Sequence, residues 1–271
     1  MTSPASLPKR DFAASGHAVL PMSIGPLDVR DVTTFETAIS ATISFYTDTE
    51  AARALLPPFF ELDGDPVVHV SHTMYEGVDY LGGRGYNVVS IGVPARYAAA
   101  DEVVRAPYHP VLWESDPMPV LLGRELGGLA KIYGEVSDAR WSNDSYDFEL
   151  KEYGNRLIVG RLTNLVPVDT DLLDQIKELG TQAFSLGWKF IPSANGTPDT
   201  SYVTKYPGEF FWREGWTGDG SLEFTPLDWA DAPISHALVK QLASLPQLGI
   251  RDVMVLKGSG RLTRSAVRQL G

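Results

Sequence analysis

The stretch that decides the fold runs Gly123-Arg-Glu-Leu-Gly-Gly-Leu-Ala-Lys131-Ile-Tyr133. Its glycines are typical of a tight loop, and the residues from Lys131 onward are typical of a β-strand. In such a strand Lys131 and Tyr133 share one face, while Ile132 lies on the other. Alternation alone therefore favours a lysine that points to solvent.

The same stretch resembles the G-R-E-x-x-G-x-P-K signature of acetoacetate decarboxylases, whose final lysine forms an imine with the substrate. The spacing from Gly123 to Lys131 equals that of the signature. The resemblance implies that Lys131 is the imine-forming residue. It reverses the solvent-facing interpretation for Lys131, though not for Tyr133 or Glu135.

Other segments resemble the family in the same order along the chain. Residues 46–63 resemble its N-terminal helix and following turn, 189–198 resemble its K-I-I-P and D-G-x-P segment, and 214–218 resemble its E-A-W-T-G segment. The agreement extends over roughly residues 40 to 257. It implies an acetoacetate decarboxylase-like fold and a homo-oligomer.

Local patterns independently indicate an α+β protein with mainly antiparallel β structure. Strands are predicted over 67–75, 86–93, 110–114, 131–136, 146–151, 156–163, 201–213, 222–224 and 252–256, and helices over 49–56, 171–179 and 234–242. Asp48 is the expected cap of the first helix. We expect a single domain over 1–271 with a curved sheet or closed β-barrel core, a few peripheral helices, and an irregular N-terminal arm over 1–30.

The composition argues against binding to nucleic acid or membranes. Lys and Arg total 23 against 34 for Asp and Glu, and a net charge of −11 repels phosphate backbones and anionic lipid surfaces. Residues 1–23 lack the apolar core of a signal peptide, and no apolar run reaches the roughly 18 residues of a spanning helix. We expect a cytoplasmic protein.

No cofactor or metal is predicted. The chain has no cysteine, which excludes thiolate ligands and thiol nucleophiles. His69 and His72 are spaced so that a strand would place their rings on opposite faces, which disfavours a shared metal. Neither Gly83-Arg-Gly85 nor Gly258-Ser-Gly260 has the context of a nucleotide-binding loop.

Imine chemistry requires a neutral amine. An ordinary lysine amine, with a pKa of about 10.4, is almost wholly protonated at neutral pH and cannot attack a carbonyl group. Burial or a neighbouring cation disfavours the ammonium form. Here the family's second, adjacent lysine is replaced by Ile132, so we expect burial to activate the amine. The proline before the catalytic lysine is likewise replaced, by Ala130.

The sequence also lacks the family's usual carboxylates. Tyr86 matches a family tyrosine, but Val88 stands where a glutamate should follow it, and a second glutamate aligns near Ser71. A different carboxylate, Glu114, ends Pro110-Val-Leu-Trp-Glu114, which resembles a branch of the superfamily with a Trp-Glu pair here.

The resemblance implies Lys131 and Glu114 as catalytic residues and predicts substrate contacts at Tyr86, Val88, Trp113 and Arg124. From local pattern alone, Glu114 is an exposed strand-end residue. Arg124 either binds a substrate carboxylate or shapes its own turn together with Glu125.

The leading hypothesis is a cofactor-independent lyase that forms an imine between Lys131 and a small keto acid. The expected small-molecule partner is a keto acid or an aldehyde. The missing carboxylates favour an aldol and dehydration sequence over decarboxylation. Two alternatives stay open: a decarboxylase of a larger or more apolar β-keto acid, and a non-catalytic small-molecule binding protein on the same fold.

Overall fold

The computed structural model describes residues 18–20, 27–28 and 30–271. Most of the predicted arm over 1–30 lies outside these residues. Within it, β1 (Ala18–Val19) and β2 (Leu27–Asp28) pair as short antiparallel strands.

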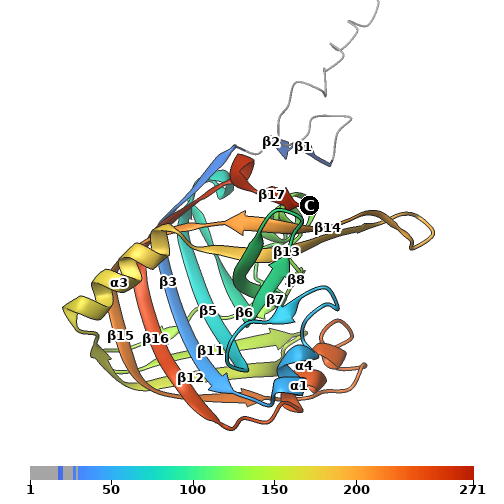
Figure 1. Ribbon diagram of the computed structural model, residues 1–271. Coiled ribbons are helices and arrows are strands. Elements are labelled where there is room, and N and C mark those ends of the chain that lie inside the picture. The colour runs from blue at the N-terminus through green and yellow to red at the C-terminus, as the bar shows by residue number, and fades with distance from the viewer. Residues whose placement is uncertain (1–17, 21–26, 29) are drawn as a thin grey trace, which may run out of the picture.

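The centre of the fold is a curved sheet of long antiparallel strands (Figure 1). In spatial order its central strands are β15 (Glu209–Phe224), β16 (Gly249–Thr263), β3 (Val32–Tyr46), β5 (Val67–Val78), β6 (Arg84–Ala98) and β7 (Val103–Glu114). The mainly antiparallel prediction is confirmed. The sequence analysis missed β3, although Ile39, Ala41, Ile43 and Phe45 alternate along it in the manner of a strand with one buried face.

Shorter strands extend both ends of this sheet. Beyond β15 lie β12 (Asn155–Pro167), β11 (Tyr146–Glu152), β10 (Arg140–Trp141) and β9 (Glu135–Val136), and beyond β7 lie β13 (Phe184–Pro192), β14 (Pro198–Pro207) and β17 (Arg268–Leu270). β4 (Glu61–Leu62) pairs with β6, and β8 (Lys131–Tyr133) adds to β7 in parallel. The path ends at β10 and β17, so the sheet is curved but open and the closed-barrel alternative is not adopted.

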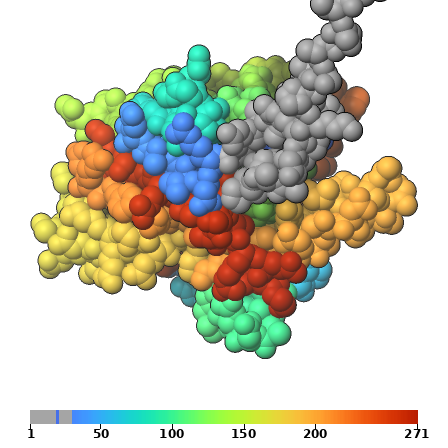
Figure 2. Space-filling model, turned by 90° about the horizontal axis from the view of Figure 1, so that it is seen from above, coloured from blue at the N-terminus to red at the C-terminus, as the bar shows by residue number. Residues whose placement is uncertain are grey.

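Helices are few and peripheral, as predicted. They are α1 (Thr49–Arg53), α2 (Pro117–Leu122), α3 (Thr170–Thr181) and α4 (His236–Ala243), with short helical turns at Asp79–Leu81, Gly123–Gly127 and Arg264–Ala266. Asp48 occupies the N-cap of α1, but its side chain makes no capping hydrogen bond. The β13–β14 hairpin extends beyond the body of the molecule (Figure 2).

The two faces of the central strands have different environments. One face packs into the main core, where Ile43, Val70, Ile91 and Trp113 meet residues of β11 and β12. The opposite face carries hydroxyl and imidazole side chains and lines a cavity. Because side chains alternate along a strand, one set of residues builds the core and the intervening set builds the cavity wall.

His72 is a buried polar group on the core face, and all of its polar atoms are paired. Its ring stacks on Phe148, Nδ1 bonds the Tyr146 hydroxyl at 2.8 Å, and Nε2 lies 3.0 Å from the Ser137 carbonyl oxygen. A carbonyl oxygen only accepts, so Nε2 carries the proton and the neutral ring accepts from Tyr146. Burial lowers the pKa of His72 to about 4.

We predict that His72 makes the fold sensitive to mild acid. An unfolded histidine has an ordinary pKa of about 6.5, so between about pH 6.5 and 4 the unfolded chain binds a proton that folded His72 refuses. The free energy of unfolding should fall with decreasing pH, by up to about 1.4 kcal/mol per pH unit for each such histidine. Urea denaturation at several pH values over this range measures the unfolding free energy. Its decrease with falling pH should be smaller in His72→Gln than in the wild type, and an equal decrease would contradict a neutral His72.

Candidate active site

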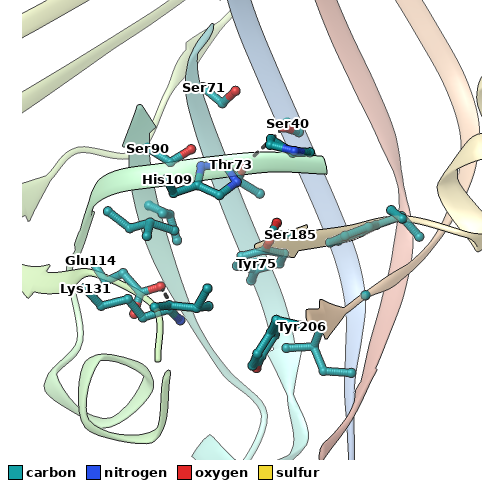
Figure 3. A pocket seen from close by; sticks show the side chains of 18 of the residues that line it. Ser40, Ser71, Thr73, Tyr75, Ser90, His109, Glu114, Lys131, Ser185 and Tyr206 are labelled. Carbon is teal, nitrogen blue, oxygen red and sulfur yellow. Dashed lines mark hydrogen bonds and ion pairs between the residues drawn. The ribbon is translucent and has the colours of Figure 1, made fainter. Parts of the chain in front are cut away.

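A cavity of about 290 Å³ lies against the polar face of the central strands (Figure 3). β3, β5, β6 and β7 form one wall, with hydroxyl groups from Ser40, Thr73 and Ser90. β13, β14 and β15 contribute the other side, including Ser185 and Tyr206. Lys131 and Glu114 lie together at one end and point toward each other.

The loop before Lys131 directs its side chain into this cavity. Residues 123–127 form a π-helical turn that Gly128 ends with a φ of 71°, a left-handed conformation that favours glycine. Gly123 has no side chain to block the lysine, since a Cβ there would lie only 2.4 Å from the Lys131 Cδ. The strand then pairs in parallel with β7, placing Lys131 opposite Leu112. As a result Lys131 is only 7% exposed, and the solvent-facing interpretation is wrong.

Lys131 and Glu114 form a buried ion pair. The Lys131 Nζ lies 2.7 Å from the Glu114 Oε1 and 3.3 Å from the Pro119 carbonyl oxygen, to which it donates. Glu114 is 1% exposed, so it is not the exposed strand-end residue that local pattern indicated. Burial raises the pKa of the Glu114 carboxyl, and Lys131 partly opposes that effect.

The second carboxylate oxygen of Glu114 is unpaired within the described part of the chain. Oε2 is buried and has no hydrogen-bond partner among the residues described. A buried acceptor without a partner is costly, and a substrate or water hydroxyl in the cavity can satisfy it. The pair therefore brings an amino group and a carboxylate to the same cavity.

The described cavity lining around the pair is largely apolar and otherwise uncharged. Val88, Leu112 and Leu129 line the cavity near it, together with the phenols of Tyr75, which is partly buried, and Tyr86, which is buried. Burial raises the pKa of both phenols well above the ordinary value, so they are neutral hydroxyls. Among the described residues that line the cavity, Lys131 is the sole Lys or Arg and Glu114 the sole Asp or Glu.

The predicted site residues divide into two groups. Lys131, Glu114, Tyr86 and Val88 all line the cavity. Trp113 follows the opposite face of β7, where it is fully buried in the core and its Nε1 donates to the Ser235 Oγ at 2.9 Å. Its predicted substrate contact is therefore corrected, because neighbouring strand residues point to opposite faces.

Arg124 also lies away from the cavity lining. Its guanidinium donates from Nη1 to the Lys131 carbonyl oxygen at 2.9 Å, and the residue is exposed. This contact fits the loop-shaping role left open for Arg124, although the partner is the Lys131 backbone and the described residues show no ion pair between Arg124 and Glu125.

The sequence analysis missed much of the cavity wall. Ser40 belongs to the unpredicted strand β3, and Tyr206 lies at the end of β14. The polar alternation of Ser40, Thr42 and Ser44 on β3 was a usable signal for a wetted face. No comparable local signal existed for Tyr206, whose position depends on the pairing of β13 with β7 through Leu186 and Tyr108.

The described residues form neither a metal-binding cluster nor a membrane-spanning helix. Within the described ranges, no group of three or more His, Asp or Glu side chains could hold a metal ion. No helix of the described chain is long and apolar enough to cross a membrane.

Comparisons with known proteins place the chain in a family. The model of the family described as acetoacetate decarboxylase (ADC) matches residues 21–258. This match covers most of the chain, which therefore belongs to the acetoacetate decarboxylase family. A search of curated proteins finds no match.

Solved structures show the same fold. An acetoacetate decarboxylase from Legionella pneumophila is 22% identical, with a TM-score of 0.72 and coverage of 95% of both chains. An acetoacetate decarboxylase-like enzyme from Sphingomonas wittichii RW1 is 14% identical, with a TM-score of 0.71 over 93% of this chain and 98% of that one. The enduracididine biosynthesis enzyme MppR, solved with pyruvate, is 16% identical, with a TM-score of 0.67 over 89% of this chain and 90% of its own.

We predict that removing one partner of the buried pair destabilises the fold in a pH-dependent manner. Lys131→Met leaves the Glu114 carboxylate buried without its cation, which should cost about 3 kcal/mol of unfolding free energy near pH 8. The cost should shrink as the pH is lowered toward 5, because burial raises the pKa of Glu114 and a protonated carboxyl needs no cation beside it.

The control is the double variant Lys131→Met/Glu114→Gln, in which no charge stays buried. It should be more stable near pH 8 than Lys131→Met alone. Urea denaturation of the three proteins at both pH values measures these differences. Equal stability of the single and double variants near pH 8 would contradict a charged Glu114.

Proposed function

We propose that the protein is a cofactor-independent carbon–carbon lyase that binds a small keto acid as an imine on Lys131. The observation that carries the proposal is the buried contact of 2.7 Å between Lys131 Nζ and Glu114 Oε1 at the end of the cavity. A proton that passes from Nζ to Oε1 leaves the neutral amine, the form that attacks a carbonyl carbon.

Glu114 then supplies the proton transfers of imine formation. Nζ attacks the keto carbon and a carbon–nitrogen bond forms. The carbinolamine hydroxyl takes a proton from Glu114 and leaves as water, which gives the imine. A raised pKa suits Glu114 to both directions of transfer, since it holds a proton more readily than an ordinary carboxylate.

The imine is the point at which carbon–carbon chemistry begins. As a protonated imine it withdraws electrons from the adjacent carbon, so that Glu114 or a water can remove a proton there and leave an enamine. The enamine carbon attacks an aldehyde, and loss of water from the adduct follows. The structural neighbour MppR has been solved with the condensation product of pyruvate and imidazole 4-carboxaldehyde, which supports this aldol and dehydration route.

A second candidate is decarboxylation of a larger or more apolar β-keto acid. Val88, Leu112 and Leu129 would favour an apolar substrate, and the cavity lining described has no second Lys or Arg to stabilise its carboxylate. A carboxylate held without a cation loses carbon dioxide more readily, because the electrons of the breaking carbon–carbon bond move onto the protonated imine and leave a neutral enamine, which removes both charges.

We predict that borohydride traps a keto acid on Lys131. Wild-type protein is treated with pyruvate, acetoacetate and longer keto acids, and adducts are located by intact mass and peptide mapping. We expect an adduct on Lys131 that Lys131→Met lacks. Absence of any adduct across the panel, with a ligand that still raises the melting temperature, would replace the enzyme proposal with the binding-protein alternative.

Product analysis separates the two enzymatic routes. Carbon dioxide released from a β-keto acid in step with substrate loss would support decarboxylation. A new carbon–carbon bond formed from pyruvate and an aldehyde, without carbon dioxide, would support the aldol route.

We predict that Glu114 determines the acid limb of the pH profile, in which the rate of imine formation falls at low pH. Because burial raises the pKa of Glu114, the trapping rate of the wild type should begin to fall, as the pH is lowered, while the pH is still above 4.5, the ordinary pKa of glutamate. Glu114→Gln should slow trapping by about 100-fold or more and remove that limb. Glu178→Gln, an exposed position on α3, is the matched control and should leave the profile unchanged.

A further inference from the structure

A second cavity adjoins the one that holds Lys131. Its volume is about 450 Å³, and Ser71, Pro107 and His109 line both cavities. The two cavities therefore meet at these three residues, next to the cavity that holds Lys131. His109 is labelled in Figure 3 above the Lys131 and Glu114 pair.

His109 presents a hydrogen-bond acceptor at the junction of the two cavities. Its Nδ1 lies 3.1 Å from the Ile91 carbonyl oxygen, and a carbonyl oxygen only accepts, so Nδ1 carries the proton. Burial, opposed by the Ile91 hydrogen bond and assisted by His69 and Lys131, lowers the pKa of His109 to about 4, so the ring is neutral at pH 7. Its Nε2 has no protein partner among the described residues and is an unprotonated acceptor.

His69 repeats this arrangement inside the second cavity. The Ser44 hydroxyl donates to the Asp252 Oδ1 at 2.7 Å, so at the 2.9 Å contact the His69 Nδ1 must donate to the Ser44 Oγ. Burial also lowers the pKa of His69, which leaves a neutral ring with Nε2 as an acceptor. No described side chain or backbone donor occupies that Nε2.

Gly92 keeps the space between the two rings open. It pairs with His69 in the sheet, and a Cβ placed on it would lie 3.4 Å from His109 Cε1 and 3.6 Å from His69 Cβ. The two imidazoles therefore flank a position with no side chain. Along β5, His69 lies two residues from Ser71, about 7 Å farther along the same face.

The charges around the second cavity determine which hydrogen-bond donors of a ligand it can accommodate. Asp63 and Arg105 line it and pair with each other, with the Arg105 Nε 3.3 Å from the Asp63 Oδ1. The two imidazole acceptors are neutral, and the charges of Asp63 and Arg105 balance each other, so they offer no excess negative charge to an ammonium group. The lone pairs of the two acceptors repel a carboxylate. Neutral donors such as hydroxyl groups match this chemistry best.

We propose that the second cavity is the subsite for the distal part of the substrate, and that it takes a hydroxylated chain whose OH groups donate to His69 Nε2 and His109 Nε2. This inference rests on the proposed function in that the reacting carbonyl lies at Lys131. In the aldol direction the hydroxylated chain belongs to the aldehyde partner, and in the product it is the tail of the keto acid. His69 is a specificity-determining residue for this tail.

The first test compares two keto acids of equal length, one with hydroxyl groups at the far end and one without. Borohydride trapping on Lys131 at increasing keto acid concentration gives a half-saturating concentration for each. Wild type should half-saturate with the hydroxylated acid at about tenfold lower concentration, the effect expected of a well-made hydrogen bond. His69→Leu and Gly92→Val should remove this preference while pyruvate trapping stays unchanged.

Two variants serve as controls for this test. His236→Leu makes the same substitution on α4, outside both cavities, and should retain the preference. Gly92→Val leaves both imidazoles in place but fills the space between them, so the test does not depend on the folding of His69→Leu alone. Equal half-saturation of the two acids in wild type, with pyruvate still trapped, would overturn the subsite while leaving the imine intact.

The second test measures ligand binding at the subsite without formation of an imine. A polyol such as erythritol has no carbonyl group, and its hydroxyls should move the ¹⁵N resonances of His69 Nε2 and His109 Nε2 upfield in a saturable manner. His69→Leu assigns one of these signals. A shift seen when no keto acid can be trapped would support the subsite and reject the proposed function. No shift at high polyol concentration would overturn the subsite.

Discussion

The arrangement of the site depends on the cost of burying the Lys131 and Glu114 charges together. Each charge alone would be strongly unfavourable in the apolar end of the cavity, and each is tolerated because the other lies 2.7 Å away. The same burial that makes the pair costly also raises the pKa of the Glu114 carboxyl. The stability of the site and its proposed reactivity therefore depend on one contact, which the loop, the strand pairing and the cavity wall hold in place.

Strand pairing fixes that contact. β8 joins β7 in parallel with Lys131 opposite Leu112, and Glu114 lies two residues farther along the same face of β7. A slip of one residue would turn Lys131 or Glu114 toward the core. The glycines of the preceding turn remove the side chains that would obstruct the lysine, so the loop supplies clearance and the sheet supplies distance.

The sequence predicted the family, the antiparallel character and the two candidate residues Lys131 and Glu114, because these depend on residue types at short, fixed spacings. It did not place Trp113 or Arg124 correctly with respect to the cavity. The face of β7 that Trp113 occupies is decided by the register with β6, and the exposure of Arg124 by the π-helical turn. Tyr206 and Ser185 were beyond prediction, since β13 and β14 reach the cavity only through long-range pairing.

The alternation of the central strands separates two kinds of evolutionary change. Substitutions at Ile43, Val70 or Ile91 alter the main core, whereas those at Ser40, Ser71 or Ser90 alter the wall of the cavity and leave the core packing in place. Substrate preference can therefore drift among relatives without loss of the scaffold. This is consistent with structures that keep the fold at identities of only 14–22%.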